Sequence, residues 1–568
     1  MKKLLIGAAA TALLTACGNQ TEDQVATDVA DAGAVAVQSA EDALAALGNI
    51  SLRGGDASQA EAALAAMSLA TSGEGRVTFD ERAVDGANAT FSNVSITLPD
   101  HVGDEDGPHI DFGNDFEGGI LTVETVEFEG LDMTDAGASF ARMAFNGLEF
   151  APTPDDEPDD DDIAEAGVGE VELINPSPEV SAWIASLMGN ADPAPFPTGD
   201  ALGFDRLRFS DLALVAEDGD AGSSADITLG SLDFGGAQAG ELGVAALNGL
   251  SVAIQDDDAE GPVNLSLSSM SVAGAKTALM GLIATDPAGA DAATDVISQL
   301  FASPVEPGFD RLDITDLSFV GEGISLSMPK WEQAVSRRAD GLPIAFETAP
   351  YALTLSADPS GGEAGGELAG ALGMVGFQTL ELTGQSKASY DPDSDLLTMA
   401  ANDNVFTLKD GFSLKLGGAI GGYKSYGEAL AGMGLADLAN GANPDPEVMQ
   451  TAVEALYLQG LELELDDNSM VDRMINLFAA QNGQDPQGVR NQAVTGLAMA
   501  PMMAGGMGID MAIVTEATAA LSSFITSPGT LTIKLDPEAP LSAESFASLE
   551  DPSSLTKEFL GLSIQHTD

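Results

Sequence analysis

The chain has 568 residues, and 21 Lys and Arg residues stand against 90 Asp and Glu residues, for a formal net charge of −69. Hydrophobic residues make up 44 % of it, which excludes a disordered acidic tail and leaves enough apolar material for several domain cores. The basic residues are too few for a phosphate-binding footprint, so we expect no nucleic-acid partner. One Cys and three His exclude a disulfide framework and a Cys/His zinc site within the chain, and we expect no metal and no cofactor.

The first 17 residues have the features of a lipoprotein signal. A cationic start, Met1-Lys2-Lys3, precedes an apolar stretch over residues 4–14 that is too short to remain as a membrane span. The next residues, Leu14-Thr15-Ala16-Cys17, resemble the lipobox of bacterial lipoproteins. This resemblance implies cleavage before Cys17, a diacylglycerol on its sulfur and an acyl chain on its new amino group. Several acyl chains together give stable membrane anchoring, which a single chain does not.

The residue after the lipobox cysteine bears on location. Gly18 follows Cys17 where an Asp would indicate retention at the inner membrane, so the signal looks like one for outer-membrane sorting. We therefore expect a chain that is lipid-anchored in the bacterial cell envelope, with its body in the periplasm. The membrane is then a partner through the N-terminal lipid.

An apolar pattern recurs along the body. Five apolar positions are separated by two, one, two and one other residues, and the pair before the fourth position is rich in Gly, Asn and Asp. Because a three-residue step turns side chains to the other face of a strand, each copy predicts a bulged strand or a tight hairpin. We favour the bulge, since the arms are too short for good hairpins. The copies are Val123/Val126/Phe128/Leu131/Met133, Phe140/Met143/Phe145/Leu148/Phe150, Phe204/Leu207/Phe209/Leu212/Leu214, Leu242/Ala245/Leu247/Leu250/Val252, Phe309/Leu312/Ile314/Leu317/Phe319 and Val453/Leu456/Leu458/Leu461/Leu463.

Two copies belong to a longer repeat. Residues 203–218 and 308–323 share nine of sixteen residues at an offset of 105, and each follows an apolar helix-like stretch and a Pro-containing loop. This similarity predicts a duplicated unit of helix, loop and β-meander. The repeated residues form either a shared structural corner or a repeated binding site.

The other predicted elements complete an α+β fold that is mainly β, an elongated antiparallel sheet of repeated meanders with interleaved helices. Alternating strands are expected at 76–79, 91–98, 351–355, 406–416 and 531–535. Helices are expected at 179–189, 274–302, 426–440, 445–455, 468–482, 487–500 and 509–526. The predicted domains are a signal peptide (1–16), a tether and Ala-rich helical segment (17–72), a β-rich region (73–174) with an acidic loop (151–166), a first helix-plus-meander repeat (175–275), a second (276–425) and a helical region with closing strands (426–568).

The turn Tyr390-Asp391-Pro392-Asp393-Ser394-Asp395, the segment Gly529-Thr530-Leu531-Thr532-Ile533 and the repeated strands together resemble AsmA-like and YdgA-like β-rich envelope proteins of Gram-negative bacteria. That resemblance implies a β-rich protein of the envelope. Those families begin with an inner-membrane helix, whereas this chain begins with a lipobox.

Candidate chemical sites are sparse. His101 and His109 lie among several carboxylates and could ligate a divalent ion, but a long solvated loop fits this segment better. Asp391, Asp393 and Asp395 alternate as in a calcium loop that lacks its Gly and its terminal Glu. A methionine group could bind Cu(I), but its helical spacing fits a soft packing stripe better; it comprises Met499, Met502, Met503, Met507 and Met511.

These observations favour a non-enzymatic envelope lipoprotein with a structural or binding role. Such a protein would hold an apolar ligand such as a lipid, or a protein partner, along a β-sheet groove. The candidate groove residues are Phe204, Leu207, Phe209, Phe309, Leu312 and Ile314. The same residues could instead form the core. The alternative function is an envelope hydrolase whose catalytic carboxylates are hidden among the 90 acidic residues.

Overall fold

The structure is a computed structural model that divides into two compact units. Among the residues it describes, the first unit comprises those from 47 to 276 and from 308 to 322, and the second comprises those from 323 to 568. The residues it describes are 47–97, 102–103, 109–110, 120–151, 163–190, 197, 199–218, 223–255, 261–276, 308–422, 424, 426, 450, 453–504, 510–547 and 554–568.

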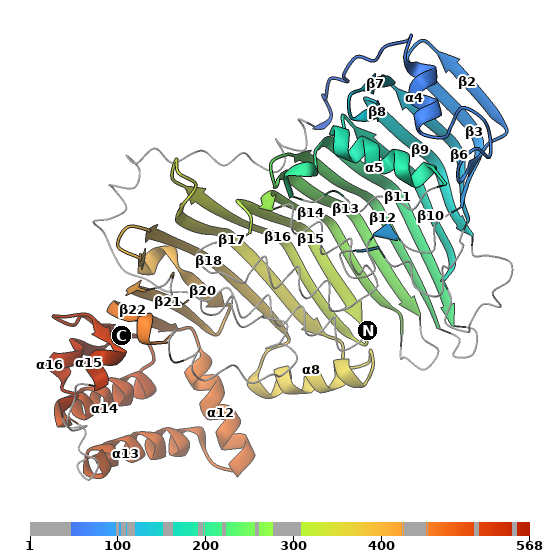
Figure 1. Cartoon of the computed structure of the whole chain (residues 1–568). Coiled ribbons are helices and arrows are strands. Elements are labelled where there is room, and N and C mark those ends of the chain that lie inside the picture. Colours follow the sequence, from blue (N-terminus) through green and yellow to red (C-terminus); the bar gives the residue numbers. More distant parts are fainter. Residues whose placement is uncertain are drawn as a thin grey trace. The chain divides into compact units, whose positions relative to one another are not determined.

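The first unit is an antiparallel sheet in which sequence neighbours pair almost throughout (Figure 1). Its long strands pair in the order β3-β6-β9-β10-β11-β12-β13-β14-β15. They are β3 (Asn88–Thr97), β6 (Ile120–Glu129), β9 (Arg142–Ala151), β10 (Ile163–Ile174), β11 (Phe204–Asp218), β12 (Ser223–Ala237), β13 (Glu241–Gln255), β14 (Val263–Lys276) and β15 (Arg311–Gly321). Short strands β1 (Val77–Thr78) and β2 (Glu81–Asp85) pair with β3, while β4 (Val102–Gly103) pairs with β5 (His109–Ile110) and β7 (Asp132–Thr134) with β8 (Gly137–Ser139).

A row of kinks crosses this sheet at the repeated turn residues. Ser210 pairs with Ser231, and Leu212 pairs with Leu229. The facing residues between them, Asp211 on β11 and Gly230 on β12, are left out of the ladder, and the register does not change. The same omission recurs at each strand pair from β3 to β15. Every second strand has a residue with a left-handed backbone there: Asn93, Gly147, Asp211, Gly249 and Asp316, with φ between +49° and +68°. We call these positions the kink row.

The kink row confirms an irregularity at the predicted position in four copies of the apolar pattern, but not the predicted bulge, because no residue is inserted and the register is the same on both sides of the kink. In β9, β11, β13 and β15 the whole kink lies inside one continuous strand, which excludes the hairpin alternative. The copy in β22 (Tyr457–Asp467) bulges on one side only, at Gln459. The prediction was also wrong for the first copy. There β6 ends at Glu129, and the chain leaves the sheet at Gly130, whose φ is +67° and whose Cα lies so near Ala141 that a side chain would clash.

Two helices close the β3 end of the first unit. Helix α4 (Ala60–Ala66) and helix α5 (Pro178–Met188) bury Leu64, Val180 and Ile184. Ser177 caps α5 by accepting a hydrogen bond from the Val180 N–H. Four phenylalanines pack edge to face beneath them, and this aromatic core consists of Phe79, Phe91, Phe128 and Phe140.

The second unit contains antiparallel strands of its own, which are β16 (Ile324–Arg337), β17 (Pro343–Ala357), β18 (Thr379–Asp391), β19 (Leu396–Met399), β20 (Val405–Leu408), β21 (Phe412–Gly421), β22, β23 (Thr530–Leu535), β24 (Leu541–Ser542) and β25 (Leu562–Thr567). The stretch predicted as one strand over 406–416 is a hairpin, because Asp410 has a φ of +56° and turns β20 into β21. The predicted turn before Leu396 is confirmed between β18 and β19.

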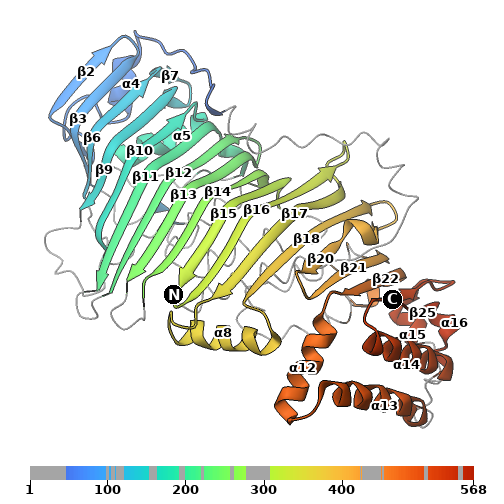
Figure 2. The same cartoon turned by 180° about the vertical axis from the view of Figure 1, so that it is seen from behind.

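The helices of the second unit lie beside different strands: the first is next to β16 and β17, and the last three are next to β23, β24 and β25 (Figure 2). They are α8 (Glu363–Val375), α12 (Met470–Asn482), α13 (Pro486–Ala504), α14 (Met511–Thr526), α15 (Ala543–Ala547) and α16 (Lys557–Leu560), and they confirm the predictions at 468–482, 487–500 and 509–526. Nearly all of the predictions at 274–302 and 426–440, and most of that at 445–455, fall outside the described residues. The fold is thus α+β and mainly β, with antiparallel meanders and interleaved helices, as predicted. None of the described helices is both long and apolar enough to span a bilayer.

The kink row makes a stability prediction at Gly249. Because Asn and Asp fill the same position on other strands, Gly249→Asn should leave the free energy of unfolding unchanged within about 0.5 kcal/mol. A β-branched residue resists a left-handed backbone, so Gly249→Val should destabilise the first unit by about 2 kcal/mol. Urea denaturation followed by circular dichroism measures both, and equal stability of the two variants would contradict the prediction.

Candidate functional site

Because of the kink row, the apolar side chains before and after the kink of each strand lie on the same face of the first sheet. As a result, the apolar residues of neighbouring strands form rows that run across the sheet, and we call this surface the apolar face. One row is Leu212, Leu229, Leu250, Leu267 and Leu317, on β11 to β15. A second, on the same side of the kinks, is Leu214, Ile227, Val252, Leu265 and Phe319. Two more lie on the other side of the kinks: Leu207, Phe234, Ala245, Val272 and Leu312, and Phe209, Leu232, Leu247, Met270 and Ile314.

Burial of the apolar face changes along the sheet. At the β3 end, residues such as Val94 and Val126 are buried beneath Leu69 and Met188. From β11 to β15, in the first two rows, Leu229 and Leu267 are buried, whereas Leu212, Leu250, Leu317 and their neighbours in the outer row are only half-buried. The apolar face is therefore a closed core at one end and partly accessible at the other.

The predicted groove residues divide between these two environments. Phe204, Phe309 and Leu312 are at most 4 % exposed, so they are part of the core. Leu207, Phe209 and Ile314 are half-buried on the apolar face. The accessible part includes residues that were not on the predicted list, above all the leucine row beyond the kinks. The pattern contained that row, but only the register shows that its members lie side by side.

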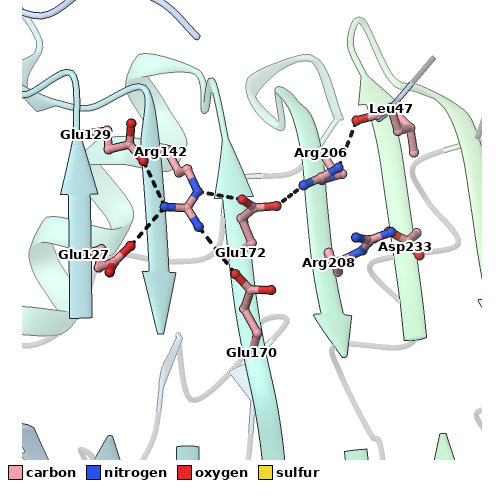
Figure 3. A network of polar contacts seen from close by, with 9 residues as sticks. All are labelled: Leu47, Glu127, Glu129, Arg142, Glu170, Glu172, Arg206, Arg208 and Asp233. Atoms are coloured by element: carbon pink, nitrogen blue, oxygen red, sulfur yellow. Dashed lines mark hydrogen bonds and ion pairs between the residues drawn. The ribbon is translucent and has the colours of Figure 1, made fainter. Parts of the chain in front are cut away.

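The opposite face of the same sheet has a charged ladder (Figure 3). Arg142 on β9 lies between β6 and β10, and its guanidinium donates to Glu129 and Glu127 on one side and to Glu172 and Glu170 on the other, at 2.6 to 3.4 Å. Arg206 donates to the second oxygen of Glu172. One strand further, Arg208 donates to Asp233 at 2.6 Å.

Two carboxylates of the ladder are buried. Glu172 is 6 % exposed and Asp233 is 2 % exposed. Burial raises the pKa of Glu172, but the hydrogen bonds from Arg142 and Arg206 outweigh that effect, so its pKa lies below its ordinary value. Glu172 therefore stays ionised at neutral pH, as a structural counter-ion.

A segment from the N-terminal side covers the ladder. The carbonyl of Leu47 accepts from Arg206 Nη1 at 2.9 Å, and the Leu47 side chain lies against Gly235, where any larger residue would clash. Arg53 continues this contact by donating to the carbonyl of Pro176. The covered ladder fixes neighbouring strands to one another on this side of the kink row.

An opening in the second unit is a further candidate site. The β16–β17 ladder is interrupted between Ser327/Thr354 and Gln333/Thr348, and Pro329 lies in the gap. A cavity of about 540 Å³ lies there, lined by Pro329, Lys330, Pro350, Tyr351, Ala352, Thr383, Gly384, Gln385, Val405 and Thr407. Tyr351 stacks on Trp331 with ring centroids 4.9 Å apart. The polar side chains that line the cavity come from separate strands, and no contact between them brings them together at one point.

The described part of the structure does not group the other residues singled out from the sequence into a binding or catalytic site. Cys17 and His101 lie outside the described residues, and His109 is placed only as part of β5. Asp391 and Asp395 accept hydrogen bonds within their own turn, and Asp393 pairs with Arg338 at 2.9 Å. Within the described ranges, no three His, Cys, Asp or Glu residues are grouped so as to hold a metal ion.

The comparisons with known proteins add one finding. A family model described only as "Uncharacterized protein" matches residues 405–567, which belong to the second unit. No curated protein and no solved structure matches the chain.

The ladder makes a pH-dependent prediction. Glu172→Gln removes one partner of a buried ion pair and should lower the free energy of unfolding at pH 7 by about 3 kcal/mol. Because the folded pKa of Glu172 is lowered, its contribution is complete above the unfolded pKa, near 4.5, and is lost as the pH falls through the folded value. The difference between wild type and variant should therefore shrink below about pH 4.5.

Urea denaturation at pH 7 and at pH 3.5 measures this difference. The control is Glu149→Gln, which removes an exposed carboxylate of the same strand as Arg142 and should change stability little at either pH. An E172Q variant as stable as wild type at pH 7 would show that the ladder does not stabilise the fold.

Proposed function

We propose that this protein is an envelope lipoprotein that binds a lipid acyl chain along the apolar face of its first unit, without catalysing a reaction. The observation that supports the proposal is the pair of half-buried apolar rows that continue across β11 to β15 beyond the part closed by α4 and α5. Apolar rows that remain partly accessible are suited to an elongated, non-polar ligand.

The size of the face favours an acyl chain over a compact ligand. Four steps between neighbouring strands from β11 to β15 span about 19 Å, since paired strands lie about 4.8 Å apart. The hydrocarbon of one membrane leaflet is about 15 Å thick, which is the depth that acyl chains fill in a bilayer. One row is therefore long enough for a whole chain.

The charged groups of the first unit favour binding over hydrolysis. A carboxylic acid that protonates a leaving group needs a raised pKa. Glu172, a buried carboxylate, instead has a lowered pKa and two arginine partners. Asp233 likewise accepts from Arg208, and from the Ser231 hydroxyl at 2.9 Å. These groups stabilise the sheet that presents the apolar face.

The lipobox supports a location where such ligands occur. A diacylglycerol and an acyl chain on Cys17 would hold the body at the periplasmic side of the outer membrane. The chain's high negative charge would keep the body soluble next to the bilayer.

Mass spectrometry tests the binding proposal. The chain from Gly18 onward, produced in a Gram-negative periplasm and purified without detergent, should carry phospholipid or fatty acid at a fixed stoichiometry in native mass spectra and lipid extracts. A polar amide on the apolar face would be desolvated by the ligand, so the Leu250→Gln/Leu317→Gln variant should retain about tenfold less lipid.

The matched control is Ser251→Gln/Ser318→Gln, which places the same amides at the adjacent positions on the opposite face. It should retain lipid as wild type does, and circular dichroism should show that both variants are folded. A wild-type protein without bound lipid, or equal retention by the two variants, would overturn the proposed function.

Lipidation is tested separately. Cells grown with an alkyne-tagged fatty acid should label the wild-type chain, and Cys17→Ser should abolish the label and release the protein from the membrane fraction. Thr15→Ser keeps a small polar residue in the lipobox and should be labelled normally. Label that persists in the C17S variant would contradict the anchor.

A further inference from the structure

The opening between β16 and β17 departs from the rule for interior strands. β17 pairs with β16 on one side and with β18 on the other, so it lies inside its sheet. Proline is rare in such a strand because it cannot donate a hydrogen bond to a neighbour. Pro350 nevertheless lies in β17, and Pro329 lies in the facing part of β16. The hydrogen-bonded ladder is absent over residues 328–332 and 349–353, and the register is the same on both sides of them. The opening is therefore a defined gap rather than a slipped pairing.

The pairing of β17 with β18 changes at the same place. Ala349 and Pro350 together face the single residue Gln385, which makes a β-bulge. The cavity of about 540 Å³ at this point shows that the described side chains leave the opening unfilled, and Pro350, Ala352 and Thr383 are exposed along it. Losing ladder hydrogen bonds without gaining packing lowers stability, and such departures are expected at functional sites.

The charges around the cavity disfavour a charged ligand. None of the described residues that line it is acidic, although 90 of the 568 residues of the chain are. A metal ion or an organic cation would therefore find no carboxylate in this lining. Lys330 is the one basic residue among the described lining residues, and its Nζ lies 3.1 Å from a carboxylate oxygen of Glu332. Because Glu332 already balances this ammonium and the chain as a whole repels anions, an anionic ligand is unfavourable as well.

The uncharged groups of the cavity match a ligand that is rich in hydroxyls. The side chains of Thr383 and Gln385 each donate and accept hydrogen bonds, as sugar hydroxyls do. The Gln385 amide donates to the carbonyl of Asn402 at 3.5 Å, which is a long contact that a ligand can replace. The rings of Pro350 and Tyr351 offer apolar surfaces, and the C–H face of a sugar ring gains by leaving water against them. A fatty acyl chain would instead leave the threonine and the amide without partners.

We propose that this cavity binds an uncharged sugar, with the sugar ring against Pro350 and its hydroxyls bonded to Thr383 and Gln385. The volume of about 540 Å³ lies within the range of about 300–1,000 Å³ that is typical of small-ligand sites. The proposal does not rest on the acyl-chain site of the first unit, because every residue that lines the cavity belongs to the second unit.

Saturation-transfer NMR tests the site. The chain from Gly18 onward is mixed at millimolar sugar concentration with cellobiose, maltose or N,N′-diacetylchitobiose, which are all uncharged. Saturation of the protein should reach the ring protons of at least one of these disaccharides. Ala352 pairs with Thr383 within the cavity lining, so Ala352→Phe should fill the cavity and weaken binding of that disaccharide about tenfold. Thr383→Val removes one hydroxyl with little change of shape and should weaken binding about threefold.

The matched control is Ser327→Phe, which places the same aromatic ring at an exposed position of β16 outside the cavity lining. This variant should bind the disaccharide as the wild type does. Circular dichroism should show that all three variants are folded, since Ser327, Ala352 and Thr383 are exposed.

Three results would overturn the proposal: no saturation transfer to any of the three disaccharides, an A352F or T383V variant that binds as the wild type does, or equal loss in S327F. Lipid carried by the first unit should be the same in A352F as in the wild type, so a failure here is distinguishable from a failure of the proposed function.

Discussion

The first sheet depends on a single backbone constraint. At the kink row, two facing residues of each strand pair are left out of the ladder, while the register on either side stays the same. Without this constraint, a side-chain period of two would place the apolar residues before and after each Asn-Gly or Ser-Asp pair on opposite faces. With it, Leu247 and Leu250 point the same way, as do their neighbours on each strand. The apolar face exists because every second strand supplies a residue that tolerates a left-handed backbone.

The two faces of this sheet stabilise the fold through different interactions. The apolar face gains from removing hydrocarbon from water, and it does so most completely at the β3 end, where α4 and α5 cover it. The opposite face buries ionised carboxylates, which is unfavourable unless each is matched by a cation with good geometry. Arg142 and Arg206 provide that match at Glu172, with 21 basic residues available in the whole chain. Scarce arginines are thus concentrated where a carboxylate has lost its water.

Much of this architecture could be read from the sequence, because it is encoded by local patterns. The apolar spacing and the turn residues within it predicted bulged strands. Four copies are continuous strands with a kink but no inserted residue, and the copy in β22 has a bulge. The same reasoning failed at Gly130, where contact with Ala141 from a later segment decides the path. It also failed over 406–416, where Asp410 was read as a strand residue although its backbone turns.

The candidate site was less predictable than the fold for a related reason. Phe309 and Leu317 belong to the same apolar pattern in the sequence, yet one is fully buried and the other half-buried, because burial depends on tertiary packing that the local pattern does not encode. The charged ladder was missed altogether. Its members come from five strands, and among 90 acidic residues nothing local distinguishes Glu172 from its neighbours.

The alternation of left-handed residues along the kink row has a consequence for how such a sheet can lengthen. The strands that hold them are β3, β9, β11, β13 and β15, and the intervening strands present Glu124, Gly169, Gly230 and Ser268, none of which has a positive φ. A strand of one kind must be followed by one of the other, so the sheet obeys a parity rule. Inserted material preserves the kinks only if it contains an even number of strands. The repeated segments 203–218 and 308–323 belong to β11 and β15, four strands apart, as a duplication under this rule requires.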